Sequence, residues 1–438
     1  MNSSASGHTG SRSPVKARWP TALTAGGLLA WYAADSLRHR REGGSGYELP
    51  GTLDVRSDRF LRAVEALTGA AISCGSEAQL LINGDEIFPA FLETIKGAER
   101  TLNVQTYVYW TGDIAHDVAG AICERAKAGV TCRVLLDAVG AAPMDSGLID
   151  QMTDAGVHVV RFRPPKPYAI KRIQHRTHRR LLVADGRIGM TGGVGIAQEW
   201  TGNAEDPEHW RDTHVRVEGP VVRGLQGAFA ESWLEATGCV LAGDEDLPEL
   251  EEVDDGGPMQ VMRSRAGVGD TNAEALYYLA IASARRSLEL TSAYFAPRPA
   301  FSKALQEAAQ RGVDVRVLVP GENIDKQFVR LAGRASYDEL LEAGVRIFEY
   351  GPTMLHAKSL CVDEAWSSVG SVNFDNRSFA LNDEATLCVQ SEAFAAKLHE
   401  AFERDLTVSD ELTLDAWRSR GRLQRLGERA GQLARREI

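Results

Sequence analysis

Two stretches of the chain show the same order of apolar and polar positions. Residues 102–107 (Leu-Asn-Val-Gln-Thr-Tyr) and 288–294 (Leu-Glu-Leu-Thr-Ser-Ala-Tyr) alternate in the manner of β-strands. Each is followed by a helical segment that ends at a glycine, and then by a continuous apolar run, 130–136 or 313–319, typical of a buried strand. The repeated order indicates an internal duplication.

A third pair of strands follows in both halves, at 155–160 (Ala-Gly-Val-His-Val-Val) and 343–348 (Ala-Gly-Val-Arg-Ile-Phe). Strands that alternate with helices predict an α/β sandwich for each half, with helices on both faces of a largely parallel sheet. Two such lobes facing each other would form one site at their pseudo-twofold interface.

With 438 residues, the chain is too long for one ordinary core. Eight acids between Asp244 and Asp255, closed by Gly-Gly-Pro, predict a solvated linker. The predicted divisions are an N-terminal tail over 1–50, a first lobe over 51–242, the acidic linker over 243–258, a second lobe over 259–405 and a basic amphipathic C-terminal helix over 406–438.

The tail contains a short apolar segment, Trp19 to Ala34, with cations on both sides. It is shorter than the roughly 20 residues of a spanning helix, so it predicts either an interfacial membrane anchor or marginal span, or an amphipathic helix packed on the body. The C-terminal helix could likewise contact a membrane surface or dock on the body. The six cysteines form no Cys-x-x-Cys pair, which predicts reduced core residues in a protein whose body stays in the cytoplasm. Together these features predict a location at the cytoplasmic side of the cell membrane.

The net charge of −11 is unevenly distributed. From Arg161 to Arg180 the chain carries eight cations and no acid, which indicates either a phosphate-binding segment that holds a lipid head group or a solvated loop. Tyr107 and Tyr294 end matching strands and serve either packing or the substrate. His175 lies close to a second histidine, but no matching ligand cluster indicates zinc.

Each half presents a histidine, a cation two positions later and an aspartate seven positions after the histidine. These residues are His178, Arg180 and Asp185 in the first half, and His356, Lys358 and Asp363 in the second. The residues between them are apolar and β-forming, and side chains two apart on a strand share a face. Each histidine therefore shares a face with its cation, and each aspartate lies on the opposite face in a structural role.

A glycine turn and then an acidic residue follow each motif. The turns contain Gly193 in the first half and Ser371 and Asn373 in the second, and the acids are Asp212 and Glu384. Backbone N–H groups of such turns, and the Asn373 amide, can donate to a phosphoryl oxygen. A carboxylate placed after the turn can hold the distal nitrogen of a motif histidine and fix its tautomer.

The pattern His-x-Lys-x4-Asp followed by Gly-Ser-x-Asn resembles the signature of the phospholipase D superfamily, and two copies resemble its phospholipid-acting members. The likeness covers roughly residues 78 to 405. The runs Asp375-x-Arg377-Ser378-Phe379 and Trp210-Arg211-Asp212 are similar to the bacterial cardiolipin synthases. The first copy departs from the pattern at Arg180, where the family has lysine, and at Gly195, where it has asparagine.

The resemblance implies an enzyme that transfers the phosphatidyl group of one phosphatidylglycerol to another through a phosphohistidine. It implies His178 as nucleophile, His356 as acid, and charge stabilisation by Lys358, Arg180 and Asn373 without metal or cofactor. As members of the two motifs, Asp185 and Asp363 are also included among the candidate catalytic residues. Three alternatives remain: a phospholipase D that uses water, a nuclease or other phosphodiesterase, and a non-catalytic lipid-binding protein. The acidic balance and the absence of an extended basic and aromatic groove argue against a nucleic-acid partner.

Overall fold

The computed structural model describes residues 47–51, 53–165, 174–253, 256–267 and 270–421. The candidate anchor at 19–34 and the end of the predicted C-terminal helix, 422–438, lie outside these residues. None of the helices in the described part of the chain combines the length and the apolar character needed to cross a membrane.

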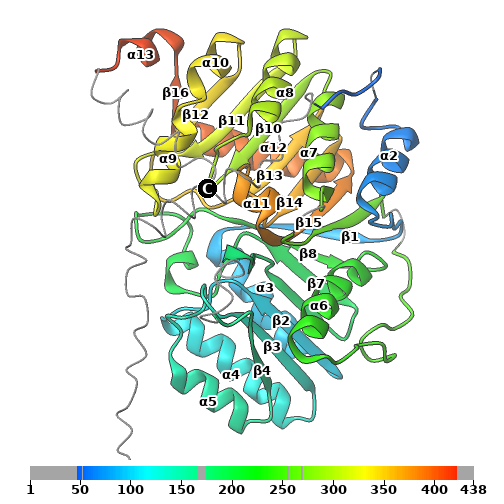
Figure 1. The fold of residues 1–438 in the computed structure, drawn as a ribbon. Helices are drawn as coiled ribbons and strands as arrows, with labels where there is room; N and C mark the ends of the chain where they lie inside the picture. Colours follow the sequence, from blue (N-terminus) through cyan, green and yellow to red (C-terminus); the bar gives the residue numbers. More distant parts are fainter. Residues whose placement is uncertain (1–46, 52, 166–173, 254–255, 268–269, 422–438) are drawn as a thin grey trace, which may run out of the picture. The chain divides into compact units, whose positions relative to one another are not determined.

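The first lobe is built on a seven-stranded sheet, flanked by α3 (Asn83–Gly97), α4 (Asp113–Lys127), α5 (Ser146–Asp154) and α6 (Val222–Thr237), as seen in Figure 1. Its strands, in spatial order, are β1 (Glu77–Ile82), β8 (Thr213–Glu218), β7 (Ile188–Gly192), β6 (Leu181–Ala184), β2 (Thr101–Thr106), β3 (Thr131–Asp137) and β4 (His158–Phe162). A short 3-10 helix, η2 (Gln198–Trp200), follows β7.

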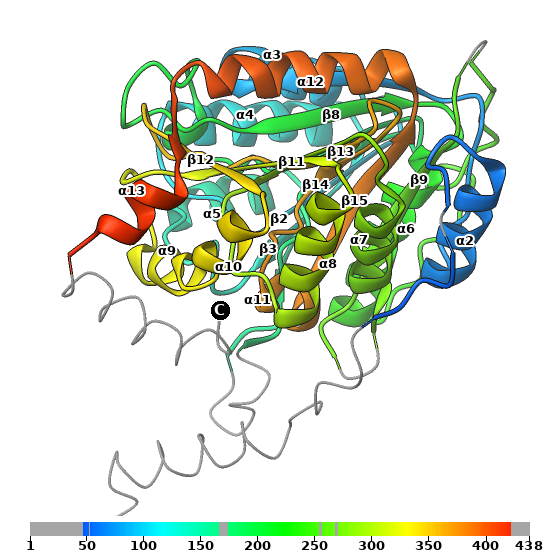
Figure 2. The same ribbon diagram turned by 90° about the horizontal axis from the view of Figure 1, so that it is seen from above.

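The second lobe repeats this order around a nine-stranded sheet. In spatial order its strands are β16 (Ser409–Leu412), β12 (Arg346–Tyr350), β11 (Asp314–Pro320), β10 (Ser287–Ser292), β13 (Lys358–Val362), β14 (Trp366–Gly370), β15 (Asn382–Gln390) and β5 (Arg176–Thr177), and β9 (Met259–Ser264) also pairs with β15. Its helices are α7 (Asn272–Ser283), α8 (Pro299–Gln310), α9 (Gln327–Arg334), α10 (Tyr337–Glu342), α11 (Asn376–Ala380), α12 (Glu392–Leu406) and α13 (Leu414–Ser419). Figure 2 shows α7 and α8 side by side against this sheet.

The duplication is confirmed, because β2, β3 and β4 pair in the same order as β10, β11 and β12. The prediction of largely parallel sheets was wrong. Apart from the short β5, which pairs parallel with β15, only these three strands of each lobe pair parallel in the described residues. Strands β6, β7 and β8 pair antiparallel, as do β13, β14 and β15. The turn from β6 to β7 is too short for the crossover that a parallel connection needs.

The lobe boundaries also differ from the prediction. Helix α2 (Asp58–Thr68), which was assigned to the first lobe, buries Phe60 and Val64 in the core of the second lobe. Strand β16 extends the sheet of the second lobe beyond residue 405. The acidic linker is not simply solvated, because Asp246 is buried and accepts a hydrogen bond from Arg133 at 2.8 Å.

The two lobes share a common core. One buried apolar cluster combines Val215 and Val217 of β8 and Phe229 of α6 with Val369 of β14 and Leu387 of β15. Strand β5 belongs to the first half of the sequence but pairs with β15 of the second lobe. This strand ends at the residue before His178, so the lobe interface positions the first motif.

Candidate active site

The backbone of each motif histidine is held by the opposite lobe. The N–H of His178 donates to the carbonyl of Asp383 at 2.8 Å, and the N–H of His356 donates to the carbonyl of Arg211 at 2.7 Å. In both cases the accepting residue directly precedes one of the predicted carboxylates, Glu384 or Asp212. The pseudo-twofold interface therefore brings each histidine beside the carboxylate of the other lobe.

His178 is held as a neutral imidazole that carries its proton on Nδ1. Its Nδ1 lies 3.0 Å from the Ser371 carbonyl oxygen and 3.1 Å from both oxygens of Glu384. A carbonyl oxygen can only accept, so Nδ1 carries the proton. The guanidinium of Arg180 lies 3.2 Å from Nε2 and can donate to it. Nε2 of His178 is therefore the nitrogen available for attack.

His356 is oriented by the carboxylate of Asp212. Its Nδ1 lies 2.7 Å from Oδ2 of Asp212, and the same oxygen accepts a hydrogen bond at 2.8 Å from the indole N–H of Trp200. The ammonium of Lys358 lies 2.9 Å from Nδ1 and 3.1 Å from Nε2 of His356. Trp200 also contacts the imidazole edge-on, with ring centroids 5.1 Å apart. No role for Trp200 was predicted from the sequence; the turn after β7 brings its indole to this carboxylate.

The two carboxylates differ in their electrostatics. Burial raises the pKa of Glu384 to about 7, although Ser371, Ser378 and Arg180 oppose the shift. Burial acts in the same direction on Asp212, but the charges of His356 and Lys358 lower its pKa to about 2. Asp212 is thus an ionised carboxylate at neutral pH, whereas Glu384 is only partly ionised there.

Both histidines are buried, which lowers the pKa of each below the ordinary value. Arg180 and Lys358 lower the pKa of His178 further, and the Ser371 carbonyl only partly opposes them. Lys358 also lowers the pKa of His356, but Asp212 raises it through its charge and its hydrogen bond. The surroundings of His356 therefore favour its protonated form more than the surroundings of His178 do.

Asp185 and Asp363 lie away from the histidine nitrogens. The Asp185 carboxylate accepts backbone N–H groups of residues 99–101, and the Asp363 carboxylate accepts those of residues 285–287. Both residues have a φ of 54°, in the left-handed turn that ends the motif strand. Their structural role on the opposite face is as predicted, so their inclusion among the reacting groups was wrong.

The glycine turns do not offer the predicted backbone donors at two positions. The N–H of Gly193 donates to Thr213 and that of Ser371 donates to Ala385, each at 3.0 Å. The hydroxyl of Ser371 instead donates a hydrogen bond to the carboxylate of Glu384. Asn373 is buried, and its side-chain oxygen has no hydrogen-bond partner among the described residues. Its amide remains the candidate contact for a phosphoryl oxygen.

A steric constraint explains why residue 195 is a glycine. A Cβ at this position would lie 2.7 Å from Cβ of Val108 and 3.1 Å from the Trp200 ring. The indole thus fills the space beside residue 195 that an asparagine would need. In place of the asparagine of the motif, the chain has a glycine that leaves room for Trp200, and the indole N–H of Trp200 donates to Asp212.

Gly195→Asn is therefore expected to damage the protein instead of restoring a lost donor. Overpacking should reduce the free energy of unfolding by about 1–3 kcal/mol, and activity should fall with it. Denaturant unfolding and steady-state rates check this, with Gly97→Asn as control because nothing lies within 4 Å of a Cβ there. Higher activity with unchanged stability would contradict the steric account.

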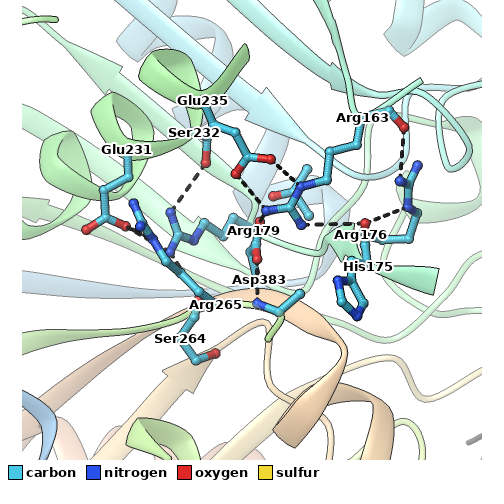
Figure 3. Close-up of polar contacts among 12 residues, drawn as sticks. Arg163, His175, Arg176, Arg179, Glu231, Ser232, Glu235, Ser264, Arg265 and Asp383 are labelled. Atoms are coloured by element: carbon cyan, nitrogen blue, oxygen red, sulfur yellow. Dashed lines mark hydrogen bonds and ion pairs between the residues drawn. The ribbon is translucent and has the colours of Figure 1, made fainter. Parts of the chain in front are cut away.

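The described part of the basic run mainly joins the lobes (Figure 3). Arg163 contacts Glu235 of α6 and Asp383 of β15, and Arg179 contacts Glu231 and the carbonyl of Ser264. These guanidinium groups already have partners, so they hold the interface that carries His178. Residues 166–173 of the run lie outside the described residues.

A family model described as "Cardiolipin synthase, PLD-like domain" matches the chain twice, over residues 91–222 and 277–406. The chain belongs to this phospholipase D-like family. Cardiolipin synthase 2 of Bacillus anthracis is 34% identical over 374 residues, which cover 84% of this chain and 72% of that protein. Cardiolipin synthase A of Pseudomonas fluorescens Pf-5 is 33% identical over 378 residues, covering 85% and 77%.

Among solved structures, phosphatidylserine synthase of Haemophilus influenzae aligns with a TM-score of 0.64 at 13% identity, over 87% of this chain and 100% of that one. This likeness supports the phospholipase D-like fold alone. Membership of the family accounts for the two motifs, their duplication and their meeting at one interface.

Proposed function

We propose that this chain is a cardiolipin synthase, a phosphatidyltransferase that uses phosphatidylglycerol as both donor and acceptor. The observation that carries the proposal is the pair of buried histidines, each held by a carboxylate of the opposite lobe. The relatives named cardiolipin synthase support the same activity.

The reaction has two steps. Nε2 of His178 attacks the phosphorus of one phosphatidylglycerol, and the bond from phosphorus to the glycerol head group breaks. His356 gives its proton to the departing glycerol oxygen. The hydroxyl of a second phosphatidylglycerol then gives its proton to His356 and attacks phosphorus, which releases His178 and forms cardiolipin.

The assignment of roles rests on the two carboxylates. The nucleophile must be neutral, and the fixed Nδ1 proton and nearby cations favour this state for His178. The acid must be protonated, and ionised Asp212 favours this state for His356. Lys358 and Arg180 lie beside the two Nε2 atoms, where they can stabilise charge on the phosphoryl oxygens. Asn373 would add its amide.

The rate is expected to be bell-shaped in pH, because the reaction needs one neutral and one protonated histidine. Both limbs belong to the coupled pair. Burial lowers the pKa of both histidines, so the acid limb of kcat/KM should lie below the ordinary value of 6.5. Rates on detergent-dispersed phosphatidylglycerol between about pH 5 and 9 check this. A monotonic rise over that range would argue against two-histidine chemistry.

Lys358 should affect the alkaline limb. Burial lowers the pKa of Lys358 to about 7, so its charge is present below that pH and is lost as the pH rises through it. A bound phosphate anion stabilises the ammonium and raises this pKa. The alkaline limb of kcat is therefore expected at higher pH than that of kcat/KM.

Hydrolysis by water is the principal alternative, because it uses the same first step. The relatives named cardiolipin synthase favour transfer to a lipid hydroxyl. Purified protein incubated with phosphatidylglycerol should yield cardiolipin and glycerol in equal amounts. Phosphatidic acid as the main product would make the chain a phospholipase D.

We also propose that the enzyme works at the cytoplasmic surface of the cell membrane. Its proposed substrate is a membrane lipid, and its six cysteines are all free, which is typical of a reducing compartment. Cys74 and Cys239 are exposed, so the prediction that all six are core residues was wrong for these two. Fractionation of expressing cells, with protease applied from either side, tests both statements. Full cleavage from outside intact spheroplasts would contradict the proposed side.

A further inference from the structure

Lys326 places a third cation beside the histidine pair, in the segment between β11 and α9. The hydroxyl of Tyr294 donates to the carboxylate of the neighbouring Asp325 at 2.8 Å, which holds this segment in place. The ammonium of Lys326 lies 4.7 Å from the centre of the Tyr294 ring, and that ring lies 6.4 Å from the His356 imidazole. Tyr294 therefore contacts both the cation and the proposed acid.

Lys326 differs from Arg298, Arg330 and Arg334 in having no ion-pair partner within the described residues. Arg330 and Arg334 form ion pairs with Glu349, and Arg298 pairs with Glu274. Within the described residues, Lys326 forms no ion pair and no hydrogen bond through its side chain. Burial lowers the pKa of Lys326, Asp325 and Asp375 oppose this, and the charges of Arg377 and Arg180 lower it further. A partly buried cation of this kind, next to other cations, favours binding of an anion.

The cation breaks the pseudo-twofold symmetry of the site. The matching segment of the first lobe, residues 138–145 after β3, contains no lysine or arginine. If His178 attacks and His356 serves as acid, the leaving glycerol and the later acceptor both occupy the side of His356. Lys326 lies against the Tyr294 ring that faces His356, and its charge also acts on His178, so it lies within reach of both sides of the site.

We propose that Lys326 binds the phosphodiester of the acceptor phosphatidylglycerol and so selects a lipid alcohol over water or free glycerol. In that acceptor three glycerol carbons separate the attacking hydroxyl from the phosphate, so a cation beside the histidine pair can hold one while the other reacts. Water and glycerol carry no phosphate and gain nothing from this contact. The inference rests on the proposed function and on the roles given to the two histidines.

The test compares two acceptors in one full-length protein. Cardiolipin formation measures transfer to phosphatidylglycerol, and incorporation of labelled glycerol into phosphatidylglycerol measures transfer to an acceptor without phosphate. Lys326→Gln is expected to lower cardiolipin formation about tenfold at limiting lipid, while glycerol exchange stays within about twofold. Lys326→Arg should restore much of the loss. Lys303→Gln is the control, because this exposed lysine of α8 pairs with Glu307 on the surface.

Equal losses of both activities in Lys326→Gln would overturn the inference, because the cation would then serve the donor phosphate. Unchanged cardiolipin formation would overturn it as well. Failure of the proposed function gives a different result, visible without any substitution. The unmodified chain would then exchange glycerol or hydrolyse lipid but form no cardiolipin.

Discussion

His178→Asn is expected to lower turnover by about 10⁴-fold or more, because it removes the atom that forms the bond to phosphorus. His356→Asn should impair turnover comparably but for a different reason. In the His356→Asn variant, His178 can still attack a substrate whose leaving group needs little protonation. No base is then present to activate the acceptor. A covalent phosphatidyl adduct should therefore persist in His356→Asn alone.

Mass spectrometry after brief incubation with an activated phosphodiester locates this adduct. The added mass is expected on the peptide that contains His178. His116→Asn is the matched control, because His116 is exposed on α4 and should leave activity unchanged. An adduct on His356 in the His178→Asn variant, with none in His356→Asn, would reverse the assignment of the two roles.

Asp212→Asn should lower kcat by about 10³- to 10⁴-fold, since an amide cannot stabilise the imidazolium and favours the wrong tautomer of its histidine. Loss of the negative charge also lowers the pKa of His356, so the alkaline limb should move to lower pH. Glu384→Gln is expected to cost less, because burial raises the pKa of Glu384 to about 7 and leaves its carboxyl partly neutral already.

Steady-state rates and pH profiles of the two variants check this asymmetry, with circular dichroism as control for folding. A larger loss in Glu384→Gln than in Asp212→Asn would contradict the proposed difference between the carboxylates. It would favour His356 as the nucleophile.

The duplication, the strands and the two histidine motifs could be predicted from the sequence because they depend on local pattern. Alternation marks β2 and β10. The prediction that each histidine lies on the same strand as its cation was wrong, because β13 begins at Lys358 and because His178 and Arg180 lie between β5 and β6. The cation still lies beside its histidine in both motifs, because the chain is extended there as well. The same reasoning put Asp185 and Asp363 on the opposite face, where they accept backbone N–H groups.

The crossed pairing could not be predicted in this way. His178 and Glu384 are 206 positions apart, and His356 and Asp212 are 144 apart. Sequence spacing shows that each half has one histidine and one carboxylate, but only the packing of the lobes decides which pair meets. The donors of the glycine turns were misjudged for a related reason, because the partners of Gly193 and Ser371 lie on neighbouring strands.

Helix α2 shows a further limit of sequence reasoning. Its apolar residues predict burial but not the surface that they contact, and Phe60 packs edge-on against Trp366 of the second lobe. The role of Trp200 was also hidden, because an aromatic residue after a glycine turn most often only packs. Its contact with Asp212 depends on the close approach that Gly195 permits.

Lipid analysis of a bacterial host that lacks its own cardiolipin synthases tests the central claim most directly. Expression of this chain should restore cardiolipin at the expense of phosphatidylglycerol, and the His178→Asn variant should restore none. Phosphatidic acid without cardiolipin, or an unchanged lipid profile with the folded protein present, would contradict the account.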